Sequence, residues 1–137
     1  GENTLIDGLI GSEKHNDGYW QGWEEDNLEI IIDLQQSKNI EMIVCGFLES
    51  HHSWIFLPKS VTVSFSFDGK NFTNKKQILL KDGKNYGSPN RKEVIFNDLR
   101  QSARYVLVEA INRKKCPGWH AGSGGKSWLF SDEIVIE

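Results

Sequence analysis

The sequence predicts an all-β protein built as an antiparallel β-sandwich of seven or eight strands. Apolar and polar residues alternate over short stretches, turn-forming residues separate those stretches, and no amphipathic helix of useful length occurs after residue 27. A chain of 137 residues fits one domain, because folding at this size buries about two thirds of the surface of the unfolded chain. We therefore expect residues 1–137 to form a single domain.

The expected strands follow one another with short turns between them. Over residues 60–67, valine and phenylalanine alternate with serine and threonine, which predicts one solvated face and one buried face that includes Phe67. Asp68-Gly69 then suits the positive φ angles of a tight hairpin turn. The remaining strands are expected, in chain order, at 28–34, 40–48, 75–80, 92–99, 103–111 and 128–137. Many short strands with turns between them are typical of a sandwich.

Composition and charge argue against two classes of partner. A net charge of −3 with 26% charged residues disfavours nucleic-acid binding, which normally needs an electropositive face. No stretch approaches the ~20 apolar residues of a membrane span, so membrane insertion is not expected. The N-terminal residues lack the basic and apolar segments of a secretory signal, and we expect a start that is mature or excised from a longer chain.

The two cysteines are expected to be free thiols. Cys45 lies in an apolar run and Cys116 lies in a loop. Free cysteine behaves as a small buried apolar residue, which favours this interpretation over a disulfide between the two.

The sequence disfavours three kinds of chemistry, two of which concern the glycine-rich stretch at residues 116–130. A phosphate-binding loop needs glycine where His120 stands, five positions before Gly125-Lys126, and a helix where a strand is expected. Zinc needs a second close ligand pair besides Cys116 and His120, and none has the spacing. The carboxylates at 24–26 read better as a solvated loop than as a glycosidase pair. We therefore expect no enzyme activity in this chain alone.

Aromatic residues in polar loops favour recognition of a sugar. A sugar ring has one face of C–H bonds and edges of hydroxyls, so it is matched by a flat aromatic beside planar polar groups. Trp54 with His51 and His52, and Trp119 with His120, are such groups. The alternative is that each tryptophan closes an open end of the sandwich, and this alternative is favoured for the remaining three, Trp20, Trp23 and Trp128.

Four stretches carry a resemblance to a known family: "LIDGLIGS", "WIFLPKSVTVSFSFDGKNF", "ARYVLVEAI" and "SDEIVIE". With them the chain resembles the coagulation factor 5/8 type C, or discoidin-like, domain, and within that group the family 32 carbohydrate-binding modules. "SWIFLPKSV" and "CPGWHAGSGGKSWLFSDEIV" are similar to C-terminal modules of bacterial β-hexosaminidases (chitobiases). The resemblance implies an eight-stranded jelly roll of the galactose-binding-domain type.

The resemblance also implies a function. It predicts a module that catalyses no reaction itself. This module targets an attached glycoside hydrolase to glycans bearing galactose, N-acetylgalactosamine or N-acetylglucosamine. The protein is then expected to be secreted, periplasmic or on the bacterial cell surface, and monomeric. The alternative is a structural domain that docks onto the catalytic domain of the same polypeptide without binding sugar.

Two sets of site residues follow from the resemblance. A structural calcium ion is expected to tie the N-terminal loop to the last strand, held by oxygens of Thr4, Asp7, Leu9, Ser12, Asp132 and Glu133. In this set Asp7 and Glu133 contribute carboxylates and Asp132 contributes its main-chain carbonyl. The sugar is expected to contact His51, His52, Trp54, Asn90, Arg91, Trp119 and His120.

Overall fold

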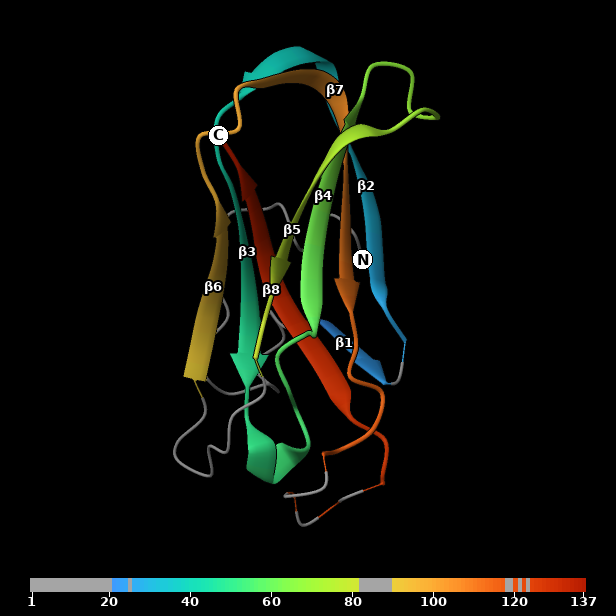
Figure 1. The fold of residues 1–137 in the computed structure, drawn as a ribbon, viewed down its shortest axis with the longest axis vertical. Helices are drawn as coiled ribbons and strands as arrows, with labels where there is room; N and C mark the ends of the chain where they lie inside the picture. Colours follow the sequence, from blue (N-terminus) through green and yellow to red (C-terminus); the bar gives the residue numbers. More distant parts are fainter. Residues whose placement is uncertain (1–20, 25, 82–89, 118–119, 121, 123) are drawn as a thin grey trace.

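The structure is a computed structural model that describes residues 21–24, 26–81, 90–117, 120, 122 and 124–137. Within these residues, eight strands form two antiparallel sheets that face each other as a sandwich (Figure 1). The predicted all-β sandwich is confirmed. The strands are β1 (Gln21–Glu24), β2 (Leu28–Ile40), β3 (Ile43–Glu49), β4 (Ser60–Ser66), β5 (Thr73–Leu79), β6 (Asn90–Phe96), β7 (Gln101–Ile111) and β8 (Trp128–Ile136).

Each sheet contains four strands, and every pairing is antiparallel. Sheet A has the order β1-β8-β3-β6 and sheet B the order β2-β7-β4-β5. Most neighbours in a sheet are therefore distant in sequence, so residues from three or four parts of the chain meet on each face. The described part of the chain contains no helix that is long and apolar enough to cross a membrane.

The core lies between the two sheets and is built from the inward side chains of both. Aliphatic residues dominate it, with Phe47 and Phe65 as large members. Cys45 is part of this core, and burial raises the pKa of its thiol to about 12. Cys45 and Cys116 are both buried free thiols, as the sequence predicted.

The observed strands depart from the predicted ones in several respects: β5, β6 and β7 each begin two residues earlier than predicted, and three further differences concern β1, the β2–β3 boundary and β4. β1 was not expected, because a four-residue segment containing glycine shows no alternation. Ile40 belongs to the end of β2, which runs through a bulge between Asp33 and Lys38, so β3 starts later than predicted. The prediction of one solvated face for β4 was wrong: all seven residues are buried, because the strand lies inside sheet B and its serines and threonine are small enough for neighbouring strands to cover.

Phe67 was expected on the buried face, and this was wrong as well. The strand ends at Ser66, the chain turns, and the Phe67 side chain is 64% exposed. The turn itself follows the prediction at Gly69, which has a φ of +77°.

The sandwich has two ends, named here by what they carry. The Trp54 end contains residues 50–59 and the described residues of 112–127, which connect β3 to β4 and β7 to β8. The C-terminal end contains the β4–β5 turn (67–72), the β6–β7 turn (97–100) and the last residue of the chain. The two ends are separated by the length of the strands (Figure 1).

A buried amide, Asn112, ties the β7–β8 connection to β1 and to the β1–β2 connection at the Trp54 end. Its side-chain nitrogen donates to the carbonyl of Trp23, in β1, at 2.8 Å and to that of Asp26, between β1 and β2, at 3.0 Å. Its side-chain oxygen accepts from the Lys114 N–H at 2.8 Å and from the Ser127 hydroxyl at 3.2 Å, just before β8. Asn112 is 1% exposed, so both halves of a buried amide are satisfied, as a stable interior requires.

We expect Asn112→Asp to destabilise the fold by about 2–3 kcal/mol, because it replaces two donors with a carboxylate oxygen facing two carbonyls. Urea unfolding followed by circular dichroism measures the loss. Asn97→Asp is the matched control: it introduces the same charge at an exposed position and should change stability by less than about 0.5 kcal/mol. Equal effects of the two substitutions would contradict the role given to Asn112.

Candidate functional site: an aromatic shelf at one end of the sandwich

The backbone after β3 places Trp54 in an unusual conformation. Residues His51–Ser53 form a single 3₁₀ turn, and Trp54 follows it with a φ of +62°, in the left-handed region. A bulky residue seldom adopts this conformation. Ser50 and Ile55 close the turn from both sides through backbone hydrogen bonds of 3.0 and 2.9 Å. The surrounding hydrogen bonds therefore hold Trp54 in a conformation that its own side chain disfavours.

The indole of Trp54 lies on the glycine-rich loop before β8. A Cβ added to Gly122 would stand 2.6 Å from Cζ2 of the indole, and one added to Gly125 would stand 2.5 Å from Cζ3. Any side chain at these two positions would displace the ring. Trp54 is nevertheless 41% exposed, so the glycines support one part of the ring while another part faces solvent. We call this ring and its supporting loop the Trp54 shelf.

Two histidines and a phenylalanine form a layer under the Trp54 shelf. The His120 ring meets the indole edge to face, with centroids 6.0 Å apart. The Gly122 N–H donates to Nδ1 of His120 at 2.9 Å, and Nε2 lies 2.6 Å from the His51 carbonyl, which assigns Nε2 as the donor. The His51 ring stacks on Phe56 at 4.7 Å. This layer fixes the height and tilt of the shelf.

Burial separates the predicted sugar ligands into contacting and supporting groups. His51 is 2% exposed and His120 is 4% exposed, so in this structure their side chains support Trp54 and offer almost no surface to a ligand. His52 is exposed, next to Trp54. Asn90 is half-buried and pairs with Glu49 at the end of β3, one residue before Ser50. Trp119 lies outside the described residues.

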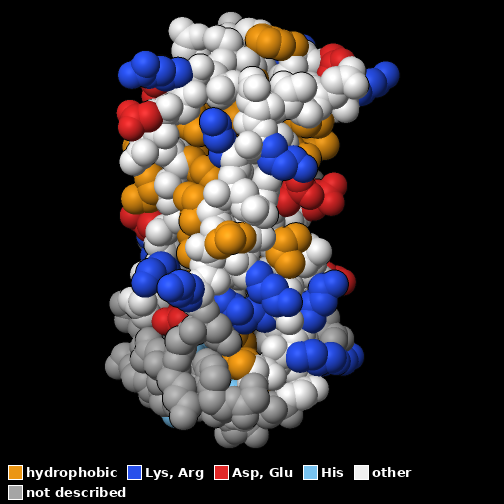
Figure 2. Space-filling view, viewed as in Figure 1, with side chains coloured by type: hydrophobic (Ala, Val, Ile, Leu, Met, Phe, Trp, Pro, Cys, Tyr) orange, Lys and Arg blue, Asp and Glu red, His pale blue; other side chains and the backbone are white. Residues whose placement is uncertain are grey.

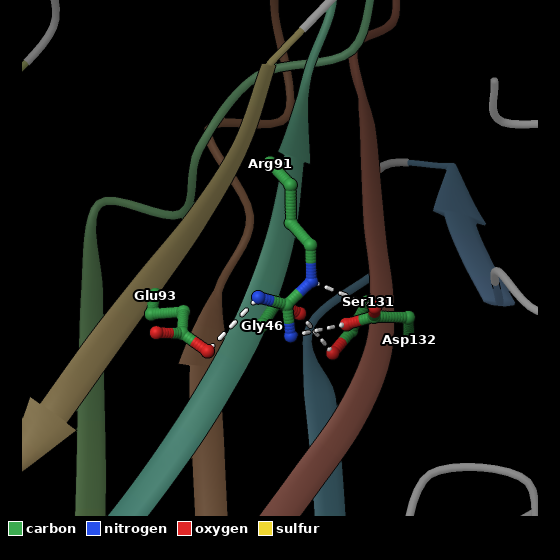
Figure 3. A network of polar contacts seen from close by, with 5 residues as sticks. All are labelled: Gly46, Arg91, Glu93, Ser131 and Asp132. Carbon is green, nitrogen blue, oxygen red and sulfur yellow. Dashed lines mark hydrogen bonds and ion pairs between the residues drawn. The ribbon is translucent and has the colours of Figure 1, made fainter. Parts of the chain in front are cut away.

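Arg91 belongs to a different cluster, on the outer face of sheet A (Figure 3). Its Nε lies 2.9 Å from Oδ2 of Asp132, and its Nη1 lies 2.9 Å from Oε2 of Glu93. The two carboxylates belong to β8 and β6, and the guanidinium reaches across β3 where Gly46 leaves room. Arg91 is thereby bound to carboxylates in this structure and is not directed at the Trp54 shelf.

The two carboxylates favour the charged form of Arg91. Burial works to lower the pKa of Arg91, but the hydrogen bonds to Asp132 and Glu93 outweigh it, and the pKa lies above its usual value. Asp132 is fully buried. It lies at a bulge, because β8 places Asp132 and Glu133 opposite the single residue Gly46 of β3.

Of the six predicted calcium ligands, only Asp132 and Glu133 are among the residues that the structure describes. Thr4, Asp7, Leu9 and Ser12 lie outside the described residues. Glu133 is 5% exposed, and the Asp132 carboxylate is bound to Arg91, which leaves the main-chain carbonyl as the group that Asp132 could offer. Among the residues that the structure describes, no three His, Cys, Asp or Glu side chains gather as a metal site.

Basic side chains border the Trp54 end. The exposed lysines 59, 81, 114 and 115 stand at the ends of β4, β5 and β7. Figure 2 shows Lys and Arg side chains gathered across the lower part of one face, beside this end. The chain as a whole is slightly acidic, at −3, so positive charge is locally concentrated near the shelf.

Several features of this end could not be read from the sequence. The glycines at 122 and 125 were visible as turn residues, but their contact with Trp54 joins positions about 70 residues apart. The burial of His51 and His120 gave no signal, because both stand in polar segments. Asn112 had no motif around it.

Two antiparallel sheets closed by irregular loops, with an exposed aromatic at one end, define a β-sandwich recognition domain. The chain belongs to the F5/8 type C domain family, because the model of that family matches residues 1–129. No curated protein sequence matches the chain significantly.

Solved structures show the same fold. A fucose binding module of Streptococcus pneumoniae superposes with a TM-score of 0.65 at 17% identity, over 98% of this chain and 80% of that chain. The C-terminal domain of a Bacteroides fragilis chitobiase gives 0.55 at 19% identity, over 98% and 78%. The lectin domain of lectinolysin, complexed with Lewis B antigen, gives 0.54 at 16% identity, over 100% and 83%.

The Arg91 cluster yields a test of stability. Asp132→Ala should lower the free energy of unfolding by about 3 kcal/mol, because it leaves a largely buried guanidinium without its main partner. Glu93→Ala removes the other carboxylate, which is 46% exposed, and should cost less than about 1 kcal/mol. Chemical denaturation of both variants gives the two values, and a larger loss for Glu93→Ala would refute this account.

Proposed function

We propose that this chain is a non-catalytic carbohydrate-binding domain. It binds glycans that carry galactose, N-acetylgalactosamine or N-acetylglucosamine, and it holds an attached glycoside hydrolase close to them. The observation that carries the proposal is the Trp54 shelf: an indole 41% exposed, supported by a glycine loop, with the exposed polar residue His52 two positions before it in the chain. A flat aromatic with polar neighbours matches the C–H face and hydroxyl edges of a pyranose.

Membership in the F5/8 type C family and the nature of the similar structures support this function. One of those proteins is a fucose binding module, another a lectin domain in complex with Lewis B antigen, and a third the C-terminal domain of a chitobiase. The chitobiase domain supports attachment to a glycan-degrading enzyme. Secretion, or placement in the periplasm or on the bacterial surface, follows from such substrates.

Binding involves stacking and hydrogen bonds, with no chemical step. Because one sugar unit makes few contacts, we expect an affinity of about 0.1–1 mM, which corresponds to roughly 4–5.5 kcal/mol. Attachment to an enzyme compensates for weak binding, since it raises the local concentration of the catalytic domain at the glycan. The supporting layer of His51, His120 and Phe56 limits the ordering that binding requires.

A second candidate function is docking onto the catalytic domain of the parent protein. Trp128 and Phe130 lie side by side on the outer face of sheet A, with ring centroids 5.7 Å apart, and pack against the buried pair Leu48 and Ile55. With Ser53 and Ile55 they line a shallow cavity of about 230 Å³. An apolar surface of this kind suits a protein partner better than a sugar.

We also propose that a structural calcium ion ties the N-terminal segment to β8, through the six ligands expected from the family. Glu133 would supply a carboxylate at a buried position, and Asp132 its carbonyl. The ion would contribute stability to the fold, since Ca²⁺ takes six to eight oxygen ligands from irregular loops.

Replacing Trp54 tests the sugar-binding function. Trp54→Ala should weaken binding to the preferred glycan about tenfold or more, while Trp54→Phe keeps an aromatic face and should lose less. A glycan array followed by calorimetric titration measures both. Ile31→Ala is the control. Ile31 is similarly exposed, at 46%, but it lies on β2 of sheet B and is not part of the Trp54 shelf.

Unchanged affinity in Trp54→Ala would overturn the assignment of the Trp54 shelf. Absence of binding to every glycan, together with tight binding of this domain to the catalytic domain of its parent protein, would establish docking as the function instead.

Chelation tests the calcium proposal. Addition of EDTA should lower the melting temperature by about 5 °C or more, because a ligand that binds only the folded state contributes a few kcal/mol. Asp7→Ala should melt lower and no longer respond to chelator, whereas Glu29→Ala, an exposed carboxylate on β2, should keep the full response. A chelator response that survives in Asp7→Ala would exclude Asp7 as a ligand.

A further inference from the structure

A second cavity lies at the C-terminal end, at the opposite end of the sandwich from Trp54. It measures about 270 Å³ and is formed by the β4–β5 turn and the start of β7. Phe67, the side chain that leaves the core at the end of β4, is 64% exposed and lines it. The turn projects beyond the body of the sandwich (Figure 1). An exposed aromatic wall beside a cavity is the same kind of element as the Trp54 shelf, built from different residues.

Polar residues also line this cavity, and one of them, Asp68, is held by several hydrogen bonds. The Asp68 carboxylate accepts hydrogen bonds at Oδ1 from the Ser66 hydroxyl and the Lys70 N–H, both at 2.8 Å, and from the Asn71 N–H at 2.9 Å. Its Oδ2 accepts from the Asn71 amide at 2.8 Å. These bonds, with those from the Asn71 and Lys70 N–H groups first, hold the pKa of Asp68 well below its usual range, so the carboxylate is ionised at neutral pH.

Asn74 supplies a second planar group, aimed by a bulge. The β4–β5 register shifts between Val63 and Phe65, and Asn74 sits at that shift with a φ of +56°. A bulge turns a side chain away from the direction that regular pairing would give it. Here the Asn74 amide nitrogen donates to Oε1 of Gln101 at 2.9 Å, and Nε2 of Gln101 donates to the Leu99 carbonyl at 3.2 Å. This chain of bonds fixes the orientation of the Asn74 amide, and Asn74 is one of the residues that line the cavity.

Side chains of β7 and β2 support the β4–β5 turn from below. The Tyr105 ring packs against Gly69, and the Arg104 guanidinium lies 5.0 Å from the centre of that ring. Arg104 in turn forms a bidentate pair with Asp33 of β2, at 2.9 and 3.0 Å. A site that is ordered before binding loses less entropy when a ligand arrives. The turn is thus already ordered before a ligand binds, which favours specific recognition by few contacts.

The chemistry of the walls selects the class of ligand. An ionised carboxylate disfavours anions, and a single carboxylate whose oxygens already accept several hydrogen bonds is a poor cation site. What remains is a neutral ring that has a C–H face for Phe67 and hydroxyl groups for the Asn74 amide and for Oδ2 of Asp68. Among the described residues, Oδ2 accepts only the Asn71 amide, whereas Oδ1 accepts three hydrogen bonds. The volume, near the ~300 Å³ lower bound of small-molecule pockets, suits one such ring.

The geometry points to a second saccharide site at the C-terminal end, formed by Phe67, Asp68, Asn71 and Asn74 and oriented by Gln101. It is independent of the Trp54 shelf, since no residue is shared and the strands separate the two. A domain with one sugar site at each end can bridge two glycan chains or two units of one long chain, so its affinity for a glycan-rich surface exceeds that of either site.

The test is a titration of ¹⁵N-labelled protein with N-acetyllactosamine and with chitotriose, followed by NMR. The expected result is that amide signals of residues 67–74 and of Gln101 shift in a saturable way with at least one of the two sugars. Phe67→Ala should weaken this response at least fivefold. Asn74→Gly keeps the left-handed backbone but removes the amide, and it should weaken the response about threefold. Leu79→Ala, 74% exposed on β5 but outside the cavity, is the matched control and should leave it unchanged.

The same titration of Trp54→Ala separates the two sites. Shifts at residues 67–74 that persist in Trp54→Ala support the second site whether or not the Trp54 shelf binds. Absence of those shifts with both sugars, equal shifts in Phe67→Ala, or equal shifts with glycerol, which has hydroxyls but no ring face, would each overturn the proposal.

Discussion

Two backbone hydrogen bonds at Trp128 determine how the Trp54 end is assembled. The Trp128 N–H donates to the Trp54 carbonyl at 2.8 Å, and the Phe56 N–H donates to the Trp128 carbonyl at 3.0 Å. They attach the connection between β3 and β4 to the first residue of β8. Because the glycine loop ends immediately before that residue, the same attachment brings Gly122 and Gly125 under the indole. Backbone pairing therefore brings Trp54 and the glycine loop together, and contacts with Gly122, Gly125 and His120 then hold the indole ring.

Asn112 and the Arg91 cluster extend this constraint to the rest of the sandwich. Asn112 fixes the segment before Ser127 relative to the β1–β2 connection, and the cluster joins β6 to β8 across β3. Both are buried or largely buried polar groups with well-defined partners, which specify one arrangement of the strands more sharply than apolar contacts do. The aliphatic core supplies most of the favourable free energy of folding, while these polar groups decide which loops meet at the Trp54 end.

The sequence predicted what local patterns can encode. Alternation located seven of the eight strands among the described residues, and Asp68-Gly69 marked the turn after β4. Prediction from the sequence failed for contacts between residues that are distant in the chain. Arg91 and Asp132 were assigned to separate sites because nothing local shows that β6 and β8 both flank β3. His51 and His120 looked like surface groups because their neighbours in sequence are polar, whereas burial comes from Phe56 and Trp54, brought over them by the turn. Phe67 looked buried because alternation does not show where a strand ends.

Among the described residues, six non-glycine residues have a positive φ, and two of them lie at the exposed aromatics. Trp54 takes a left-handed backbone conformation that a bulky residue disfavours, and Asn74, at a bulge, takes one and lines the same cavity as Phe67. Local strain persists when the surrounding structure over-determines it, and such positions concentrate at binding sites. A tryptophan that merely closed the sandwich would gain nothing from a strained backbone or from 41% exposure, since burial alone would serve that purpose. The strain and the exposure of Trp54 together are what a surface for recognition requires.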